Sequence, residues 1–292
     1  MKVAVSWSGG KDSALMLDRL LRDDRVTVAA LVTTLDESSQ CISAHGVRLE
    51  MIERQAAALG LSLSTVALPP NPSNEIYLER FAQTLAPLQE SGVDAIAFGD
   101  IFLEDLRRWR EGSFGPMGLA TIFPLWGDSS YALADEFVAR GFSAVLCCVN
   151  GAYLDQTYLG RLYDTRLFER LPHNVDRCGE NGEFHSFTFD GPIFREPVRY
   201  AAGEISYKPV MHGSPVTGHW FCDLRPLTTS QDRCPLCGGD NTCAVAAGEH
   251  GCWCFSESIA AEVLERVPPY ARDVACVCRR CVQSHSLSGS RS

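Results

Sequence analysis

The chain has 292 residues, of which 46% are hydrophobic, and a formal net charge of −10. This length favours about two domains with a sizeable core, and an acidic chain without a basic stripe is a poor candidate for unassisted binding of nucleic acid. No segment approaches the ~18 consecutive apolar residues of a membrane span, and the N-terminal apolar run is too short for a secretory signal, so we expect a cytoplasmic protein.

The first part of the chain alternates predicted strands and helices. The predicted strands are residues 2–7, 26–35, 61–69 and 93–101, and the predicted helices are residues 13–22, 46–60 and 74–92. Strands that alternate with helices of this length indicate an α/β fold, in which a parallel sheet has helices on both faces.

A second region continues to residue 222. Its predicted helices are residues 104–111, 130–141 and 159–171, its predicted strands are residues 118–127 and 142–151, and β-like segments follow over 178–194 and 195–222. We assign residues 102–222 to a smaller α/β subdomain. The polar residues 223–233 are a predicted linker, and a cysteine-rich segment begins after them.

The loop between the first strand and the first helix has the sequence SGGKDS. A helix N-terminus at this place in a parallel sheet is where anions bind. Gly9 and Gly10 allow the backbone to approach a phosphate closely, Lys11 supplies a positive charge, and Asp12 suits a helix cap or a magnesium ion. The residues predicted to hold phosphate are Ser6, Ser8, Gly9, Gly10, Lys11, Asp12 and Ser13. The spacing fits neither the Walker A nor the G-x-G-x-x-G pattern, and the simpler alternative is an ordinary strand–turn–helix joint.

This loop resembles the PP-loop of enzymes that cleave ATP between its α and β phosphates. Further motifs follow in order at residues 45–63, 99–111, 123–127, 141–150, 158–164 and 178–194. Together they resemble the diphthine–ammonia ligase, or diphthamide synthase, family over residues 1–222. The resemblance implies a HUP-like, Rossmann-like nucleotide-binding core over residues 1–101 and a substrate-side subdomain over residues 102–222.

The same resemblance implies an activity and its cofactors. ATP adenylates a carboxylate, pyrophosphate leaves, and ammonia attacks the acyl-adenylate to give an amide and AMP. Activation is needed because a free carboxylate has a poor leaving group. ATP and Mg²⁺ are therefore the expected cofactors of this part of the chain, with Lys11 and Asp12 among the catalytic residues.

Other candidate site residues lie at strand ends or in the last motif. By similarity, backbone and side chains around Thr33 meet the adenine. Gly99 and Asp100 end a predicted strand, where open α/β sheets bind ligands, although Asp100 also suits a helix cap. Glu180 and Glu183 match the family's acidic signature, and such carboxylates position Mg²⁺, bind ammonium or act as a general base. A solvated turn is the simpler interpretation of this pair.

The acidic signature departs from that of family members that make diphthamide. Those members carry Glu-Gly-Gly-Glu followed shortly by another Glu, whereas this chain has ENGEFH from Glu180 to His185. The chain thus resembles a bacterial-type branch, whose substrate is either diphthine or a bacterial metabolite. We expect a carboxylate substrate, free or carried by a protein, and free ammonia, because the chain shows no glutaminase-like segment. Neither a membrane nor nucleic acid is an expected partner, and a homodimer is left open.

The C-terminal segment concentrates cysteine, and the chain has 13 cysteines in total. Two C-x-x-C spacings, one at each end, are typical of zinc sites. The predicted ligands are Cys234, Cys237, Cys243, Cys252, Cys254, Cys276, Cys278 and Cys281. Eight thiols match two Zn²⁺ ions with four thiolates each, and metal supplies much of the folding energy of so small a segment. An iron–sulfur cluster and a disulfide module are the alternatives.

Residues 234–283 also resemble the cysteine-rich CWC family, named for a motif that stands here at residues 252–254. We expect such a module to recruit a protein partner.

Two other functions fit the same motifs. A sulfur-transfer enzyme acting on RNA shares the ATP chemistry but uses a thiol nucleophile, for which Cys41 and Cys178 are the candidates. A non-catalytic regulator binds adenine nucleotide without releasing pyrophosphate. The carboxylates of Glu180 and Glu183 favour catalysis, because a nucleotide sensor has no need of them.

Overall fold

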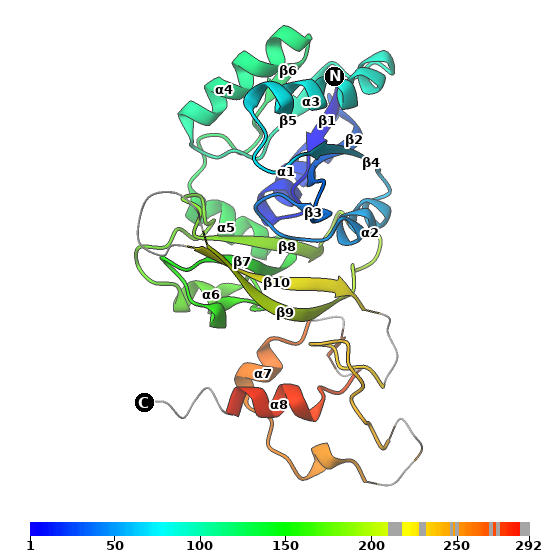
Figure 1. Ribbon diagram of the computed structural model, residues 1–292, viewed down its shortest axis with the longest axis vertical. Coiled ribbons are helices and arrows are strands. Elements are labelled where there is room, and N and C mark those ends of the chain that lie inside the picture. Colours follow the sequence, from blue (N-terminus) through cyan, green and yellow to red (C-terminus); the bar gives the residue numbers. More distant parts are fainter. Residues whose placement is uncertain are drawn as a thin grey trace.

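The computed structural model describes residues 1–209, 218–227, 232–245, 248, 251–268, 271–272 and 275–286. These residues form two sheets and a small C-terminal module that follow one another along the long axis of the molecule (Figure 1). The N-terminus lies at the first sheet, far from the module. None of the described helices is long and apolar enough to cross a membrane.

The first sheet contains the predicted parallel strands. Its order is β4-β2-β1-β5-β6, all parallel, and the short β3 pairs antiparallel with the end of β2. The strands are β1 (Lys2–Ser6), β2 (Thr27–Asp36), β3 (Cys41–Ile42), β4 (Ser62–Leu68), β5 (Ala95–Ala97) and β6 (Ala120–Ile122). The prediction of a parallel α/β sheet is confirmed.

Helices cover both faces of this sheet because its strands are apolar on both faces. The helices are α1 (Lys11–Leu21), α2 (Leu49–Leu59), α3 (Asn74–Glu90) and α4 (Glu104–Phe114), followed by the short η1 (Gly115–Met117). Val3 and Val5 of β1 belong to the core shared with α1 and α2. Ala4, which points to the opposite face, belongs to the core that Phe81 of α3 and Phe114 of α4 complete.

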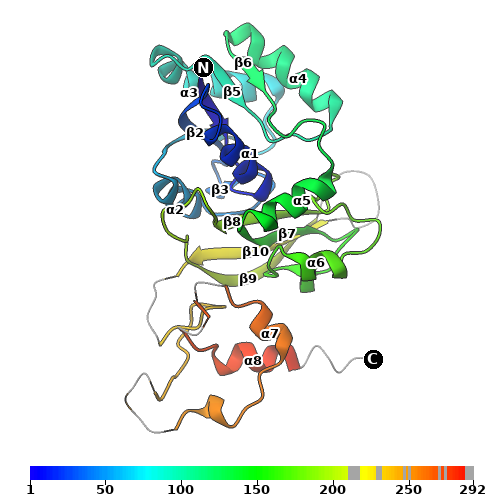
Figure 2. The same ribbon diagram turned by 180° about the vertical axis from the view of Figure 1, so that it is seen from behind.

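The second sheet is antiparallel, with the order β8-β7-β10-β9. Its elements are α5 (Ser130–Ala139), β7 (Ser143–Asn150), η2 (Gln156–Tyr158), α6 (Thr165–Arg170), β8 (Phe184–Asp190), β9 (Tyr200–Pro209) and β10 (Gly218–Pro226). Phe137 of α5 and Phe187 of β8 share one buried cluster with Leu15 of α1 and Ile52 of α2. Helices α1 and α2 therefore lie between the two sheets (Figure 2).

Two predicted boundaries differ from the structure. β6 pairs with β5, so the predicted division at residue 101 falls inside the first sheet. β10 continues to Pro226, past the predicted domain end at residue 222, because it pairs with β9 along its whole length. The strands predicted over residues 93–101 and 118–127 are also shorter, because the chain leaves the sheet after Ala97 and Ile122 to form its carboxyl edge.

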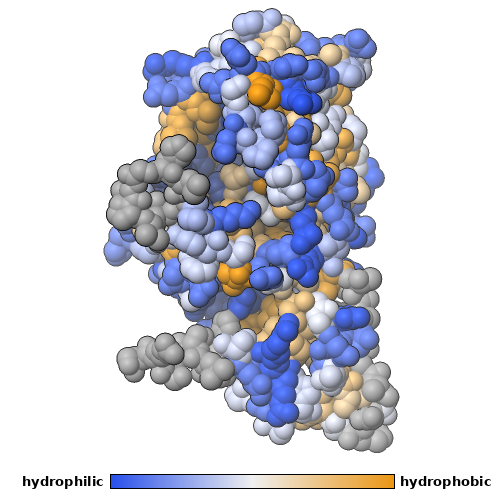
Figure 3. Space-filling model, viewed as in Figure 1, coloured by the Kyte–Doolittle hydropathy of each residue, from blue (hydrophilic) through white to orange (hydrophobic). Residues whose placement is uncertain are grey.

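The C-terminal module has a small core of its own and rests on the second sheet. It contains η3 (Trp253–Phe255), α7 (Ala261–Glu265) and α8 (Arg279–Ser286). Val263 of α7 and Val282 of α8 pack with Leu236 in its core. The backbone N–H of Ala202 in β9 donates to the carbonyl of Leu236 at 2.6 Å, which joins the module to the sheet. The face in Figure 3 carries hydrophilic residues over much of its area, with apolar residues exposed between them.

Gln55 on α2 joins both sheets although it is a fully buried amide. Its Oε1 accepts a hydrogen bond from Trp7 Nε1 at 2.9 Å, and its Nε2 donates to the carbonyls of Gly9 at 2.9 Å and Thr188 at 2.6 Å. One side chain thus links the helix, the end of β1 and strand β8.

We expect Gln55→Leu to lower the free energy of unfolding by roughly 2–4 kcal/mol, because it leaves buried polar groups without their partner. Urea denaturation measures the change, and Gln83→Leu on the exposed side of α3 is the matched control. Equal losses in the two variants would refute the linking role of Gln55.

Candidate active site and metal centre

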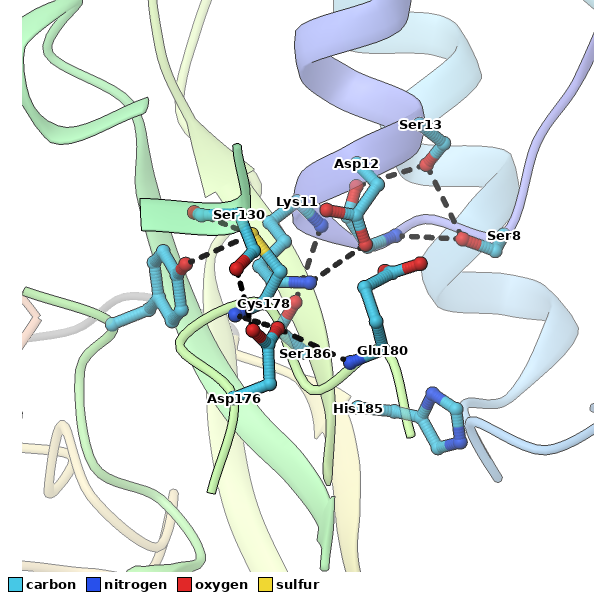
Figure 4. Close-up of polar contacts among 12 residues, drawn as sticks. Ser8, Lys11, Asp12, Ser13, Ser130, Asp176, Cys178, Glu180, His185 and Ser186 are labelled. Atoms are coloured by element: carbon cyan, nitrogen blue, oxygen red, sulfur yellow. Dashed lines mark hydrogen bonds and ion pairs between the residues drawn. The ribbon is translucent and has the colours of Figure 1, made fainter. Parts of the chain in front are cut away.

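The loop that follows β1 forms a tight turn into helix α1. Gly9 has a φ of +80°, and a Cβ there would lie 2.5 Å from Ile52 Cδ1, so only glycine fits. The backbone N–H of Gly10 donates to Ser8 Oγ at 3.3 Å, and Ser13 Oγ donates to the Gly10 carbonyl at 2.9 Å. The predicted turn between Ser8 and Ser13 is thus an ordered cradle of hydroxyls at a helix N-terminus (Figure 4).

Strand β8 of the second sheet holds this loop from the other side. Ser186 Oγ accepts a hydrogen bond from the backbone N–H of Lys11 at 3.1 Å. The N–H of Thr188 donates to the Gly9 carbonyl at 2.8 Å. Ser186 and Thr188 were not among the predicted site residues. The sequence shows only that these polar residues alternate with Phe187 and Phe189, which is typical of a half-exposed strand, whereas the structure buries all four.

Lys11 and Asp12 form an ion pair within the site. Lys11 is only 5% exposed, and its Nζ lies 2.7 Å from Asp12 Oδ2. Burial lowers the pKa of Lys11, but the Asp12 carboxylate and neighbouring acidic groups outweigh that effect and raise it above the ordinary value. Burial raises the pKa of Asp12, and Lys11 opposes this shift. The lysine therefore stays charged and available to an anion.

The loop from Asp176 to Glu183 carries the acidic signature to the same place. Asp176 Oδ1 accepts hydrogen bonds from the N–H groups of Cys178 at 2.8 Å and Glu180 at 3.4 Å, and its Oδ2 accepts one from Ser130 Oγ at 2.5 Å. Asp176 and Ser130 were not predicted. They shape the loop so that Glu180 faces Lys11 and Asp12 (Figure 4).

The two glutamates of the signature have different surroundings. Glu183 is fully buried, and its carboxylate accepts hydrogen bonds from the N–H groups of Asp176 at 3.0 Å and Asn181 at 2.9 Å. Glu180 is half-buried instead. Burial, with Asp12 next in effect, raises the pKa of Glu180 to about 8. Glu183 thus organises the loop, whereas Glu180 is a proton-carrying group beside the phosphate turn.

Two histidines adjoin the same turn. A Cβ on Gly10 would lie 2.8 Å from His45 Cε1, and the ring of His185 lies 4.6 Å from that of His45 between centroids. Burial, with Lys11 adding to it, lowers the pKa of His45 to about 4 although the bond to the Ser186 carbonyl opposes it. Burial also lowers the pKa of His185. Both imidazoles are therefore uncharged at neutral pH.

The remaining predicted residues lie around this centre. A Cβ on Gly99 would lie 3.4 Å from the backbone carbon of Asp12, so Gly99 borders the start of α1. Asp100 is bound by Arg110, whose Nε lies 2.6 Å from its Oδ2. Ser6 ends β1 and is half-buried. Thr33 of β2 is buried, and within the described residues its hydroxyl has no hydrogen-bond partner.

Cys178 does not have the surroundings of a reactive thiol. It is 2% exposed, and its Sγ lies 3.2 Å from the Ser130 carbonyl and 3.9 Å from the Tyr163 hydroxyl. Burial raises the pKa of Cys178 to about 12, with Lys11 opposing. Since the thiolate is the nucleophile, these observations disfavour the sulfur-transfer hypothesis.

The module gathers four predicted thiols into a metal-competent cluster. The sulfur atoms of this cluster all lie within 4.8 Å of one another and belong to Cys234, Cys237, Cys278 and Cys281. Four thiolates at such distances match the tetrahedral donor set of zinc. The other four predicted thiols, of Cys243, Cys252, Cys254 and Cys276, are electrostatic neighbours of one another. Among the described residues, however, only the first four form a metal-competent cluster.

Comparison with known families gives three matches in chain order. The diphthamide synthase N-terminal domain matches residues 1–119, and the diphthamide synthase C-terminal domain matches residues 129–213. The cysteine-rich CWC family matches residues 234–283.

Curated relatives match over most of their length. A diphthine–ammonia ligase of Danio rerio is 28% identical over 228 residues, which cover 70% of this chain and 88% of that protein. The diphthine–ammonia ligase of Homo sapiens is 25% identical over 249 residues, with 77% and 92% covered. A solved structure titled a predicted subunit of tRNA methyltransferase from Methanocaldococcus jannaschii is 15% identical and has a TM-score of 0.36. The match covers 66% of this chain and 98% of that one.

The raised pKa of Glu180 makes the stability of the ligand-free protein depend on pH. The native carboxyl keeps a proton between pH 4.5 and about 8 that an unfolded chain releases, so the free energy of unfolding falls as the pH rises through this range. We expect this fall to be smaller in Glu180→Gln than in the native protein. Urea denaturation from pH 5 to 8 without Mg²⁺ or nucleotide measures it, with the exposed Glu53→Gln as control. Parallel curves for the native protein and Glu180→Gln would count against the buried proton.

Proposed function

Because the chain belongs to the diphthamide synthase family, we propose that its turn from Ser8 to Ser13 holds the phosphates of ATP while a substrate carboxylate is adenylated. The chain is an ATP-dependent ligase that forms a C–N bond. The observation that carries the assignment of the site is the buried Lys11, held at a hydroxyl-lined helix N-terminus and facing Glu180. A structural joint between strand and helix has no need of such a group.

In the first step the carboxylate oxygen attacks the α phosphorus and the bond to the β phosphate breaks, so that pyrophosphate leaves with the electron pair. Lys11 and the N–H groups at the start of α1 stabilise the charge that collects on the phosphate oxygens. Oxygen donors of Asp12 and Glu180 suit Mg²⁺, which when bound would neutralise phosphate charge. Thr33 is the residue proposed to meet the adenine. Gly99 and Asp100 are proposed to line the nucleotide site beside the start of α1, where Arg110 holds the Asp100 carboxylate in place.

In the second step the ammonia nitrogen forms a bond to the acyl carbon and AMP leaves with the electrons of the acyl–oxygen bond. The nitrogen must then lose a proton. The ionised form of Glu180 is the group proposed to take it, because a pKa of about 8 leaves part of this carboxyl ionised near neutral pH. Glu183 is a positioning residue, since both of its oxygens hold the loop that presents Glu180.

The substrate is a carboxylate carried either by a protein or by a small molecule. The curated relatives are named for diphthine and ammonia. Because this chain has ENGEFH at the acidic signature, its carboxylate substrate is to be identified by assay. Purified protein with Mg-ATP and ammonium, supplied separately with the protein and the small-molecule fraction of a cell extract, tests the assignment. AMP and pyrophosphate formed with one fraction alone would identify the carrier, and ADP with phosphate would overturn the proposal.

We expect Lys11→Ala to lower kcat roughly 10²–10³-fold, because it removes a positive charge aimed at the departing phosphates. Pyrophosphate release under saturating ATP measures the effect, and circular dichroism checks the fold. The control is Lys208→Ala on the exposed part of β9. Normal turnover by a folded Lys11→Ala protein would remove the phosphate turn from the mechanism.

The module is proposed to hold two Zn²⁺ ions, one on each set of four thiols. We expect metal analysis of the purified protein to give two zinc ions per chain, and Cys237→Ser or Cys254→Ser to retain one. Cys41→Ser, outside both sets, is the control and should retain two. A single zinc ion in the native protein would rule out the second zinc site. Iron together with sulfide would show that the thiols bind an iron–sulfur cluster instead of zinc. Recruitment of a protein partner by this module stays a prediction, as do the homodimer and the cytoplasmic location.

A further inference from the structure

The loop between β3 and α2 brings a histidine, His45, against the phosphate turn, and the proposed reaction does not yet use it. A Cβ on Gly10 would lie 2.8 Å from His45 Cε1, so one edge of the imidazole covers this glycine. Gly10 is the N-terminal cap of α1, and the N–H groups at such a helix end attract anions. The imidazole therefore borders the place where phosphate oxygens are proposed to lie.

The backbone turn that carries His45 is tight and strained. Ala44 has a φ of +63°, in the left-handed region that residues with a Cβ rarely adopt. The N–H of His45 donates to the Ser43 carbonyl at 2.8 Å, and the N–H of Gly46 donates to the Ile42 carbonyl at 2.9 Å. Strain of this kind persists only where surrounding contacts hold it, and it is concentrated at binding and catalytic sites.

Strand β10 of the second sheet supplies such contacts. Phe221 fills the space that a Cβ on Gly46 would need. Two residues further along, Arg48 pairs with Asp223 of the same strand, and its Nε lies 2.5 Å from Oδ1. The loop that carries His45 is thus held from the side opposite its own sheet, and the position of the imidazole depends on the assembly of both sheets.

A hydrogen bond to Ser186 decides which ring nitrogen of His45 is free. Nδ1 lies 3.1 Å from the Ser186 carbonyl oxygen, which can only accept, so Nδ1 carries the proton. The uncharged ring therefore has an unprotonated Nε2, to which no hydrogen bond is found among the described residues. Ser186 also accepts the N–H of Lys11 through its hydroxyl, so a single residue aligns both the imidazole and the phosphate turn.

The groups that face His45 keep its ring uncharged in the ligand-free protein. Burial, with the positive charge of Lys11 on α1 adding to it, lowers the pKa of His45 to about 4. The ring of His185 on β8, which lies 4.6 Å away between centroids, is uncharged as well. On β10 the Asp223 carboxylate is paired with Arg48. A polyanion at the turn has the opposite effect to Lys11, because nearby negative charge favours the protonated ring.

We propose that His45 is a further phosphate-binding residue, which takes up one proton from solvent when the pyrophosphate group of ATP occupies the turn and then donates Nε2–H to a phosphate oxygen. The histidine makes and breaks no bond to phosphorus, so the proton is the only atom that it exchanges. A hydrogen bond between two charged partners is a strong one, and this one forms only when phosphate is present. The role of His45 rests on the proposed function of the turn.

The test titrates the full chain, labelled with ¹⁵N in its histidines, with pyrophosphate at pH 7. Mg²⁺ is left out so that no metal competes for the groups of the turn. Long-range ¹H–¹⁵N NMR spectra show which nitrogens of an imidazole carry protons. We expect one protonated nitrogen at His45 in the free protein and two at saturation. His45→Asn assigns the signal, whereas His173→Asn, which removes an exposed histidine, should leave it unchanged.

The affinity for pyrophosphate gives a second readout. The amide of an asparagine can still donate to the Ser186 carbonyl, so His45→Asn removes the group proposed to contact phosphate and keeps the other bond. We expect calorimetry to show about tenfold weaker binding in this variant at pH 7. Proton uptake also makes affinity fall as the pH rises, so the fall between pH 6 and 8 should be steeper in the native protein than in His45→Asn. His173→Asn should match the native protein, and circular dichroism checks each fold.

The Lys11→Ala chain separates failure of this role from failure of the phosphate turn. Pyrophosphate binding that Lys11→Ala weakens, with His45 still carrying one proton at saturation, would overturn the role of His45 alone. Equal affinity and equal pH dependence in the native protein and His45→Asn would do the same. No pyrophosphate binding, or binding that Lys11→Ala leaves unchanged, would remove phosphate from the turn and would overturn both.

Discussion

The turn at the start of α1 depends on hydrogen bonds that come from the second sheet. The Gly9 carbonyl accepts bonds from the Thr188 N–H and from Gln55, and the Lys11 N–H is bound by the Ser186 hydroxyl. Each buried group would cost about 1–3 kcal/mol if left alone. A strand that follows far along the chain thus fixes the conformation of the loop near the N-terminus, and the proposed phosphate site exists only when both sheets are assembled.

The charges around this turn follow from the same assembly. Lys11 is buried and meets Asp12 from its own helix and Glu180 from the loop before β8. Burial, together with the nearby carboxylate of Asp12, raises the pKa of Glu180, so this carboxyl keeps a proton near neutral pH. Without substrates, the positive charge of Lys11 is therefore balanced by Asp12, while Glu180 is largely neutral. Glu180 can gain or lose its proton when charged substrates enter the site. Such a response suits chemistry in which phosphate leaves and ammonia gives up a proton.

The C-terminal module joins this body by a different kind of contact. Its apolar core is small, so a metal-binding cluster is the natural source of its stability. Its contacts with the second sheet include one backbone hydrogen bond at Ala202 and the pairing of Glu265 with two arginines of α6. These contacts are polar, and those of Glu265 are partly exposed.

The sequence by itself determined the parallel sheet, the glycine turn before α1 and the C-x-x-C pairs, because strand periodicity, glycine conformation and ligand spacing are properties of neighbouring residues. Only the tertiary structure decided the rest. Ser186 binds the Lys11 N–H although the two residues are 175 positions apart in the sequence. Strand β6 pairs with β5 although helix α4 separates them along the chain. Glu180 and Glu183 are three positions apart, yet one faces the site and the other is buried in its own loop. Side-chain direction in an irregular loop is set by packing against distant elements, and local sequence does not carry that information.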